Sequence, residues 1–235
     1  VLNALSTGVG SAFAIDVETT ATVELDDSGS VTGTIAEADD ADTGLIERCV
    51  ELGIATYGDG DASGGTVRTE SDVPMAAGLK SSSAAANAAV LATADAVGAD
   101  PDPLSACRLG VRAARETGVT VTGAFDDASA SMLGGVTVTD NEADDLLVRD
   151  EVAWDVLVWT PEERAYSADA DAERCANVAP MAELVEDLAV EGRYAAAMTV
   201  NGLAFSAALG FSADPAVEAM PHAAGVSLSG TGPSV

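Results

Sequence analysis

The single lysine of this 235-residue chain marks the segment that most constrains its fold. Lys80 lies in Pro74-Met-Ala-Ala-Gly-Leu-Lys-Ser-Ser-Ser-Ala84, directly before an alanine-rich stretch. A glycine followed by serines and alanines predicts a tight turn that leads into the N-terminus of a slim helix. Free N–H groups in the turn, the positive end of the helix and an ammonium group all favour a bound phosphate. We therefore expect nucleotide chemistry at this segment.

The segment has two other interpretations. A Walker-type P-loop is excluded, because that motif requires glycine directly before the lysine and this chain has Leu79 there. An ordinary serine-capped helix after a proline-glycine turn explains the same residues without any ligand. Ser81, Ser82 and Ser83 are the candidate caps, and their hydroxyls are also candidate partners of phosphate or magnesium.

The net charge of −29, from 39 acidic and 10 basic residues, argues against binding to nucleic acid or to anionic membranes. The acids are scattered along the chain, and nine of the ten basic residues are arginine. This pattern favours a surface adapted to high salt, because the Debye length falls to about 3 Å at 1 M and dense like charge is then tolerated. A cationic partner is the alternative interpretation. We expect a halophilic protein of the cytoplasm.

The cysteines and the ends of the chain carry less information. Cys49, Cys107 and Cys175 are distant in sequence and form no Cys-x-x-Cys pair, so we expect reduced thiols rather than disulfides or a zinc site. Apolar runs of about 18 residues do not occur, so no membrane span is expected. Because the chain starts without methionine and stops just after a glycine turn, we expect a longer protein beyond both ends.

Periodicity and turn residues predict an α+β chain in two lobes, with a seam near residues 140–150. The expected strands are 12–25 (one strand or a bent pair), a return strand at 31–35, then 66–71, 136–139, 146–148, 152–160 and 226–229. The expected helices are 43–57, 82–97, 102–117, a short one opened by Asp126 or Asp127, then 180–191 and 194–209.

Three segments resemble the sequence motifs of the GHMP kinase superfamily, which phosphorylates small molecules such as galactose, homoserine and mevalonate. They are the segment around Lys80, the segment Gly123-Ala-Phe-Asp-Asp-Ala-Ser-Ala-Ser-Met-Leu-Gly-Gly135, and Val226-Ser-Leu-Ser-Gly-Thr-Gly-Pro-Ser-Val235. Their order and spacing match along nearly the whole chain. Within the superfamily, Gly-Leu-Lys-Ser-Ser-Ser-Ala, Thr122-Gly-Ala-Phe-Asp-Asp127 and the opening Asn3 to Asp16 are similar to the archaeal shikimate kinase family.

The resemblance implies a two-lobed GHMP kinase fold. Residues 1–145 would form an N-terminal, ATP-binding lobe like ribosomal protein S5, and residues 146–235 an incomplete, ferredoxin-like C-terminal lobe. The implied activity is ATP-dependent phosphorylation of the 3-hydroxyl of shikimate, with ATP and Mg²⁺ as cofactors. The alternatives are another GHMP kinase, acting on homoserine or mevalonate, and a relative that kept the fold and lost the chemistry.

The resemblance also implies roles for single residues. ATP would be held by Pro74, Met75, Ala76, Ala77, Gly78, Leu79, Lys80, Ser81, Ser82, Ser83 and Ala84, and by Gly230, Thr231 and Gly232. Asp127 would orient or deprotonate the acceptor hydroxyl, and Lys80 would supply positive charge. Asp126 competes with Asp127 for the catalytic role and is otherwise expected to cap the helix. Ser82 and Glu116 would bind Mg²⁺.

The substrate pocket is less well defined by the sequence. A carboxylate such as that of shikimate favours an arginine partner, but the sequence does not single out one of the nine. Asn3 and Asp16 are candidate readers of the substrate hydroxyls. Trp154 and Trp159 are expected in the core between the lobes. His222 receives no role, and the oligomeric state is not predicted.

Overall fold

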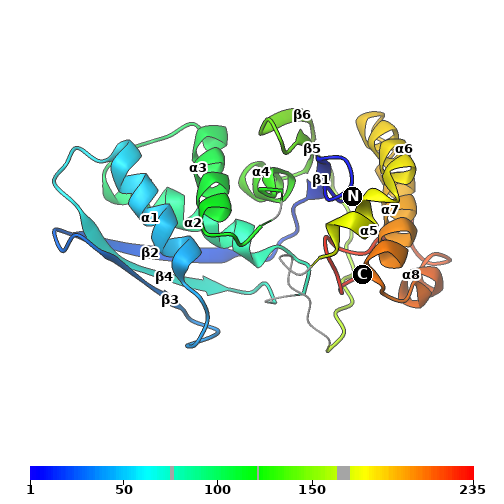
Figure 1. The fold of residues 1–235 in the computed structure, drawn as a ribbon, viewed down its shortest axis with the longest axis horizontal. Helices are drawn as coiled ribbons and strands as arrows, with labels where there is room; N and C mark the ends of the chain where they lie inside the picture. Colours follow the sequence, from blue (N-terminus) through cyan, green and yellow to red (C-terminus); the bar gives the residue numbers. More distant parts are fainter. Residues whose placement is uncertain (75–76, 121, 163–169) are drawn as a thin grey trace.

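The computed structural model describes residues 1–74, 77–120, 122–162 and 170–235 (Figure 1). Met75 and Ala76, two of the expected ATP-binding residues, lie outside the described residues. The strands are β1 (Val9–Phe13), β2 (Thr19–Asp26), β3 (Val31–Ile35), β4 (Gly64–Ser71), β5 (Val136–Asp140) and β6 (Asp145–Asp150). The helices are α1 (Gly44–Tyr57), α2 (Ser81–Ala96), α3 (Pro103–Glu116), α4 (Phe125–Leu133), α5 (Ala172–Ala176), α6 (Ala179–Val190), α7 (Tyr194–Leu209) and α8 (Asp214–Ala219).

The first layer is a sheet in the order β2-β4-β3, covered on one face by helices. Apolar residues at helical spacing in α1, such as Ile46, Cys49 and Val50, are buried with Val67 of β4 and Val90 of α2. The sheet is mixed: β4 pairs antiparallel with β2 and parallel with β3. The return strand expected at 31–35 is therefore present and runs antiparallel to β2, but it pairs with β4 rather than with β2. The helix α1 connects β3 to β4, and a helical crossover of this kind places two strands in parallel.

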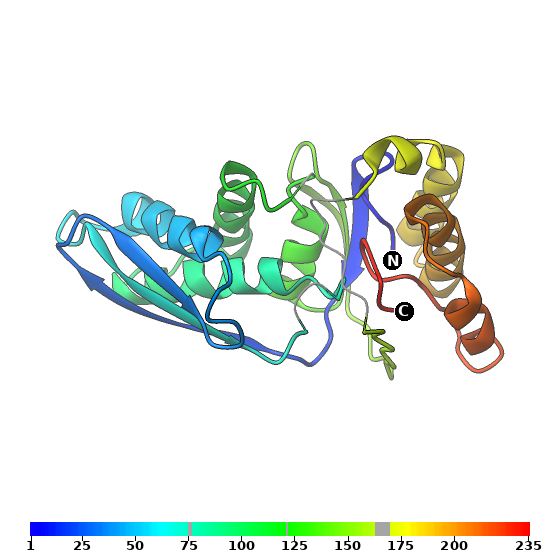
Figure 2. The same cartoon turned by 60° about the horizontal axis from the view of Figure 1, so that its bottom comes forward.

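The second sheet, β1-β5-β6, lies in the middle of the molecule beside α4 (Figures 1 and 2). The expected strand over 12–25 contains only the last two residues of β1 and nearly all of β2. The two strands belong to different sheets: β1 pairs with β5, whereas β2 pairs with β4. One pass of the chain therefore links both layers. The lobe boundary expected at 145/146 stays a prediction; it coincides with the first residue of β6, which pairs with β5.

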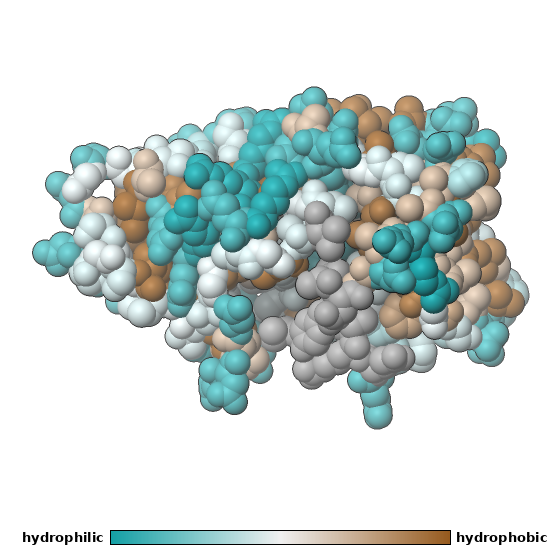
Figure 3. All heavy atoms as spheres, in the orientation of Figure 1, coloured by the Kyte–Doolittle hydropathy of each residue, from teal (hydrophilic) through white to brown (hydrophobic). Residues whose placement is uncertain are grey.

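The helices α6 and α7 pack on the face of the second sheet that is opposite α4 (Figure 2). Their buried side chains, among them Val185 and Phe205, form one core with Val136 and Val138 of β5. On the face seen in Figure 3, hydrophilic residues are spread broadly rather than gathered in one patch, as the scattered acids in the sequence imply. None of the described helices is long and apolar enough to cross a membrane.

Two expected strands are absent from the described residues. Within the described part of the chain, the segment 152–160 pairs through its backbone only with Val235, at Trp159, and Leu157 is 92% exposed. Its apolar, β-branched composition indicated an extended chain but could not indicate a neighbouring strand. The segment 226–229 packs across α7 instead, where a Cβ on Gly202 would lie only 2.7 Å from Ser227 Cα. The short helices α5 and α8 were not expected.

Candidate active site

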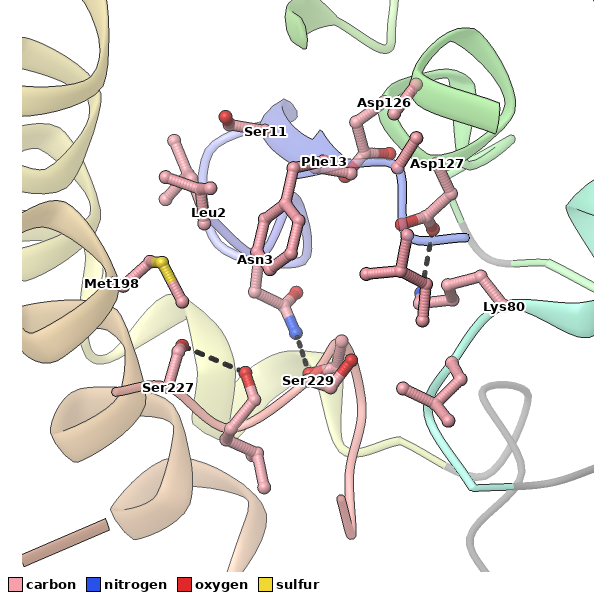
Figure 4. Close-up of a pocket in the computed structure, with 18 of the residues that line it drawn as sticks. Leu2, Asn3, Ser11, Phe13, Lys80, Asp126, Asp127, Met198, Ser227 and Ser229 are labelled. Atoms are coloured by element: carbon pink, nitrogen blue, oxygen red, sulfur yellow. Dashed lines mark hydrogen bonds and ion pairs between the residues drawn. The ribbon is translucent and has the colours of Figure 1, made fainter. Parts of the chain in front are cut away.

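A cavity of about 1550 Å³ lies between the second sheet, the start of α2, α4 and the C-terminal segment. Among the residues that line it are Leu79, Lys80, Ser82, Ser83 and Ala84 from the loop and α2, Asp126 and Asp127 from α4, Asn201 from α7, and Ser227 to Thr231. The motifs that are distant in the sequence therefore meet at one place. Figure 4 shows Asp127 and Lys80 pointing toward each other across this cavity.

The loop before α2 is packed against the C-terminal glycine turn. Gly78 has φ +81°, and a Cβ there would lie 2.5 Å from the carbonyl oxygen of Ser229 and 2.7 Å from that of Gly232. Ser229 Oγ donates a hydrogen bond of 2.9 Å to the carbonyl of Gly78. Only glycine combines this left-handed conformation with such a close approach of two backbones. The pairing of the two glycine motifs therefore has a steric cause.

The N-terminus of α2 is open rather than capped. The N-cap is Lys80, which has a left-handed backbone (φ 62°), and no side-chain cap is found among the described residues. The expectation of a serine cap was therefore wrong: Ser81 is already the first helical residue, so the serines come too late to accept from the first free N–H groups. Ser82 and Ser83 line the cavity. This helix end is free to receive an anion.

Lys80 is held between Asp127 and the glycine turn. Its Nζ lies 2.8 Å from Asp127 Oδ2, and a Cβ at Gly230 would lie 2.2 Å from its Cε. Burial disfavours the charged ammonium, but the carboxylates of Asp127 and Asp126 outweigh that effect, and the pKa of Lys80 is raised above its usual value. Lys80 therefore stays charged at any working pH.

Asp126 occupies a different environment from Asp127. It is 6% exposed, and its Oδ1 accepts a hydrogen bond of 2.8 Å from Asn141 Nδ2. Burial and the charge of Asp127 raise the pKa of Asp126 to about 6, against the opposing effects of Lys80 and Asn141. The expectation that Asp126 caps α4 was wrong, because the N-cap is Ala124, again with a left-handed backbone (φ 52°).

The C-terminal turn is tied to the start of the chain. Asn3 Nδ2 donates to the carbonyl of Gly230 at 2.7 Å, and Asn3 Oδ1 accepts from the backbone N–H of Leu5. Asn3 therefore helps to hold the turn, and because it also lines the cavity, its role as a reader of the substrate hydroxyls stays a prediction. Thr231 is buried and lines the cavity, whereas Gly232 is buried beneath Phe211.

Several expected site residues do not reach the cavity. Glu116 binds Arg48 at 2.6 Å and Arg112 at 2.7 Å, and these hydrogen bonds lower the pKa of its carboxyl. The geometry thus does not favour Glu116 as a magnesium ligand, which stays a prediction. The following expected residues are also absent from the described lining: Pro74, Ala77, Gly78, Ser81, Gly232 and Asp16.

The cationic lining of the cavity is sparse. Among the described residues, Lys80 and His222 line it and no arginine does. Trp154 contacts Phe13 of β1 and Tyr194 of α7 edge-to-face, with ring centroids 5.3 Å and 5.8 Å apart. It is nevertheless 41% exposed, so the expectation that it is a core residue was wrong. Trp159 is 51% exposed and is not a core residue.

The comparisons with known proteins agree with this geometry. Residues 44–135 match the family model of the GHMP kinases N terminal domain. A shikimate kinase from Halobacterium salinarum is 66% identical over 237 residues, which cover all of this chain and 83% of that protein. One from Methanosarcina mazei is 52% identical, with all of this chain and 80% of that protein covered.

The chain belongs to the archaeal shikimate kinases of the GHMP family.

Solved GHMP structures share the fold of this family member. The mevalonate kinase of Methanococcus jannaschii matches with a TM-score of 0.70 at 13% identity, covering 95% of this chain and 81% of that one. The homoserine kinase of Cytophaga hutchinsonii matches with 0.66 at 15% identity, covering 99% and 80%. At such low identity these structures support the two-lobed α+β fold and no particular substrate.

Sequence reasoning missed the amide side chains around the GHMP site. Asn141 binds Asp126, and Asn201 binds both the backbone N–H of Asn3 and Ser227 Oγ. Both are buried, at 1% and 2% exposure. An isolated asparagine in a sequence more often indicates a turn, so only their place beside buried polar partners reveals them.

Proposed function

We propose that this chain transfers the γ-phosphoryl group of ATP to the 3-hydroxyl of shikimate, and that Lys80 and Asp127 carry the reaction. The observation that carries the proposal is the 2.8 Å pair of Lys80 and Asp127 beside the uncapped N-terminus of α2, inside one cavity. The identities of 66% and 52% to shikimate kinases support the choice of acceptor.

The ATP phosphates are assigned to the loop between β4 and α2 and to the glycine turn. Free N–H groups at the start of α2 and the positive end of its dipole favour the phosphate oxygens. Ser82, Ser83 and Thr231 add hydroxyls from two sides of the cavity. Ala77, Gly78 and Gly232 support this cradle through the backbone packing of the two turns, without lining it themselves. A role for Pro74, which is exposed, stays a prediction.

Asp127 is assigned to the acceptor hydroxyl. The substrate oxygen attacks the γ-phosphorus, the bond to the bridging oxygen breaks, and ADP leaves with that bonding pair. Asp127 is 9% exposed and can accept the proton that the hydroxyl loses, or orient the hydroxyl before its loss. Lys80, which stays charged, offsets the negative charge that accumulates on the phosphoryl oxygens.

Magnesium suits the donor set of this site. Mg²⁺ commonly takes one or two protein oxygens together with phosphates and water, so it does not require a carboxylate cage. Among the described residues no group of three or more acidic, histidine or cysteine side chains is placed so that it could hold a metal ion. Ser82 is the protein ligand that we assign; a bound Mg²⁺ would neutralise phosphate charge and hold the phosphates in line.

A comparison of acceptors tests the proposal. ADP release at molar KCl is followed with shikimate, homoserine and mevalonate, each at equal concentration. Turnover with shikimate that exceeds the other two by at least a hundredfold is expected. Turnover of homoserine or mevalonate alone would overturn the substrate and keep the kinase, whereas ADP release with none of the three would point to a relative without this chemistry.

A further inference from the structure

Asp126 precedes the assigned catalytic residue and lines the same cavity, yet its polar atoms are bound by other residues of the protein. Its backbone N–H donates to Asn141 Oδ1 at 3.1 Å, while its own Oδ1 accepts from Asn141 Nδ2 at 2.8 Å. Its Oδ2 lies against Gly10, so closely that a Cβ on that glycine would be 2.4 Å away. One asparagine amide therefore holds two atoms of Asp126, and β1 supports the carboxylate from behind (Figure 4).

Asn141 is itself fixed from several directions. Thr139 Oγ1 donates to Asn141 Oδ1 at 2.7 Å. The backbone N–H of Asn141 donates to the carbonyl of Gly8 at 3.0 Å, and its carbonyl accepts from Arg115 Nη2 at 2.7 Å. The segment before β1, the end of β5 and the end of α3 therefore all determine where this amide lies.

The helix that carries Asp126 depends on such outside support. α4 has nine residues, begins after two left-handed residues, Gly123 and Ala124, and has no side-chain cap. A helix of this length is marginal without contacts to other parts of the protein. Asn141 supplies the acceptor for an N–H group of the first turn, which a cap would otherwise provide.

Successive residues of a helix point about 100° apart, so fixing one fixes the next. With Asp126 held against β1, the side chain of Asp127 is directed to Lys80, 2.8 Å away. We propose that Asn141 and Asp126 form a positioning pair, which sets the rotation of α4 and thereby aims Asp127 at the acceptor hydroxyl. The pair acts through Asp127 and not by contact with the substrate. Misplacement of a catalytic group by 1 Å can lower the rate about a hundredfold.

Exchanging the two side chains tests the pair. Asn141→Asp alone places two carboxylates at hydrogen-bond distance and should lower kcat at least tenfold, with KM for ATP and shikimate within threefold of wild type. Adding Asp126→Asn reverses the hydrogen bond, because the new amide donates to the new carboxylate, which also accepts from the backbone N–H. The double variant should recover most of kcat. Asn177→Asp, at an exposed position after α5, is the matched control and should leave kcat unchanged.

A double-mutant cycle of Asn141→Asp and Asp127→Asn distinguishes a positioning role from general damage to the fold. If the pair acts through Asp127, Asn141→Asp should lower kcat by less than twofold in an Asp127→Asn background, although it costs at least tenfold in the wild type. Equal losses in both backgrounds would overturn the proposal. So would a kcat within twofold of wild type for Asn141→Asp, or an exchanged pair that is folded and no better than the single variant.

The inference rests on the proposed function, but the two can fail separately. Wild-type turnover of shikimate tests the function, whereas the ratios between variants test the pair with whichever alcohol is turned over. Should Asn141→Asp not fold, Thr139→Val removes only the hydroxyl that donates to the Asn141 amide. It should lower kcat severalfold at unchanged KM, and an unchanged kcat would overturn the pair.

Discussion

The first turns of α2 and α4 have similar backbone conformations but carry different charges. Each helix follows a glycine with positive φ, Gly78 or Gly123, and a left-handed N-cap, Lys80 or Ala124. Neither helix has a side-chain cap. Both N-termini face the same cavity. The two helix starts therefore share a backbone conformation but have different roles.

The difference lies in what satisfies the free N–H groups. The first turn of α2 contains no acid and three serines, so its positive end is left for an anion from outside. The first turn of α4 contains Asp126 and Asp127, and Asn141 accepts from the N–H of Asp126. In the function that we propose, the N-terminus of α2 binds phosphate, whereas the N-terminus of α4 holds a carboxylate in place. An uncapped helix start in a cavity thus indicates a ligand only when the protein does not fill it.

The largest effect on turnover is expected at the N-terminus of α2, which we call the open end. Lys80→Ala removes the cation that pairs with Asp127 and should lower kcat by about 10²–10³-fold, a loss typical of a group that stabilises charge in the transition state. Arg68→Ala, which removes one positive charge from an exposed pair with Glu70, is the control and should stay near wild type. ADP release under saturating substrates is the measurement. Retention of kcat within fivefold in Lys80→Ala would contradict the assignment.

The N-terminus of α4, which we call the closed end, should make the stability of the protein depend on pH. With its pKa raised to about 6, folded Asp126 binds more protons than the unfolded chain between about pH 4 and pH 6, so its contribution to the free energy of unfolding falls as the pH rises through that window. Asp126→Asn lacks this cost and keeps an acceptor oxygen for Asn141. Because one pKa unit corresponds to about 1.4 kcal/mol, it should be more stable than wild type by about 3 kcal/mol above pH 6 and equal below pH 4.

Denaturant unfolding at fixed high salt, repeated across that pH range, measures this difference. A variant that is less stable than wild type above pH 6 would show that the carboxylate is favoured where it lies. The N-terminus of α4 would then favour a negative charge, as the N-terminus of α2 is expected to do.

The smallest effect is expected at Glu116, which the sequence places near the open end and the structure does not. Its carboxylate is bound by Arg48 and Arg112, away from the cavity lining. Glu116→Gln should therefore keep kcat and the magnesium requirement within twofold of wild type. Ser82→Ala should raise the Mg²⁺ concentration needed for half-maximal turnover severalfold. The reverse pattern would restore Glu116 as a ligand.

The sequence predicted much of this site because its motifs have local causes. Gly78 and Lys80 lie within one loop, and the helical spacing in α1 and α2 is visible without any tertiary contact. The parallel pairing of β3 with β4 and the isolation of residues 152–160 were missed, because strand composition does not identify a partner strand. Asn141 was missed because its role depends on β1, α3 and α4 meeting around one amide.

The most direct test compares the effects on kcat of replacing each of the two neighbouring aspartates. ADP release with shikimate is followed for Asp127→Asn and Asp126→Asn, with the KM for ATP measured for each. The account predicts a loss in kcat of about 10²–10⁴-fold for Asp127→Asn with little change in KM, and less than tenfold for Asp126→Asn. A larger loss for Asp126→Asn, or an active Asp127→Asn variant, would contradict it.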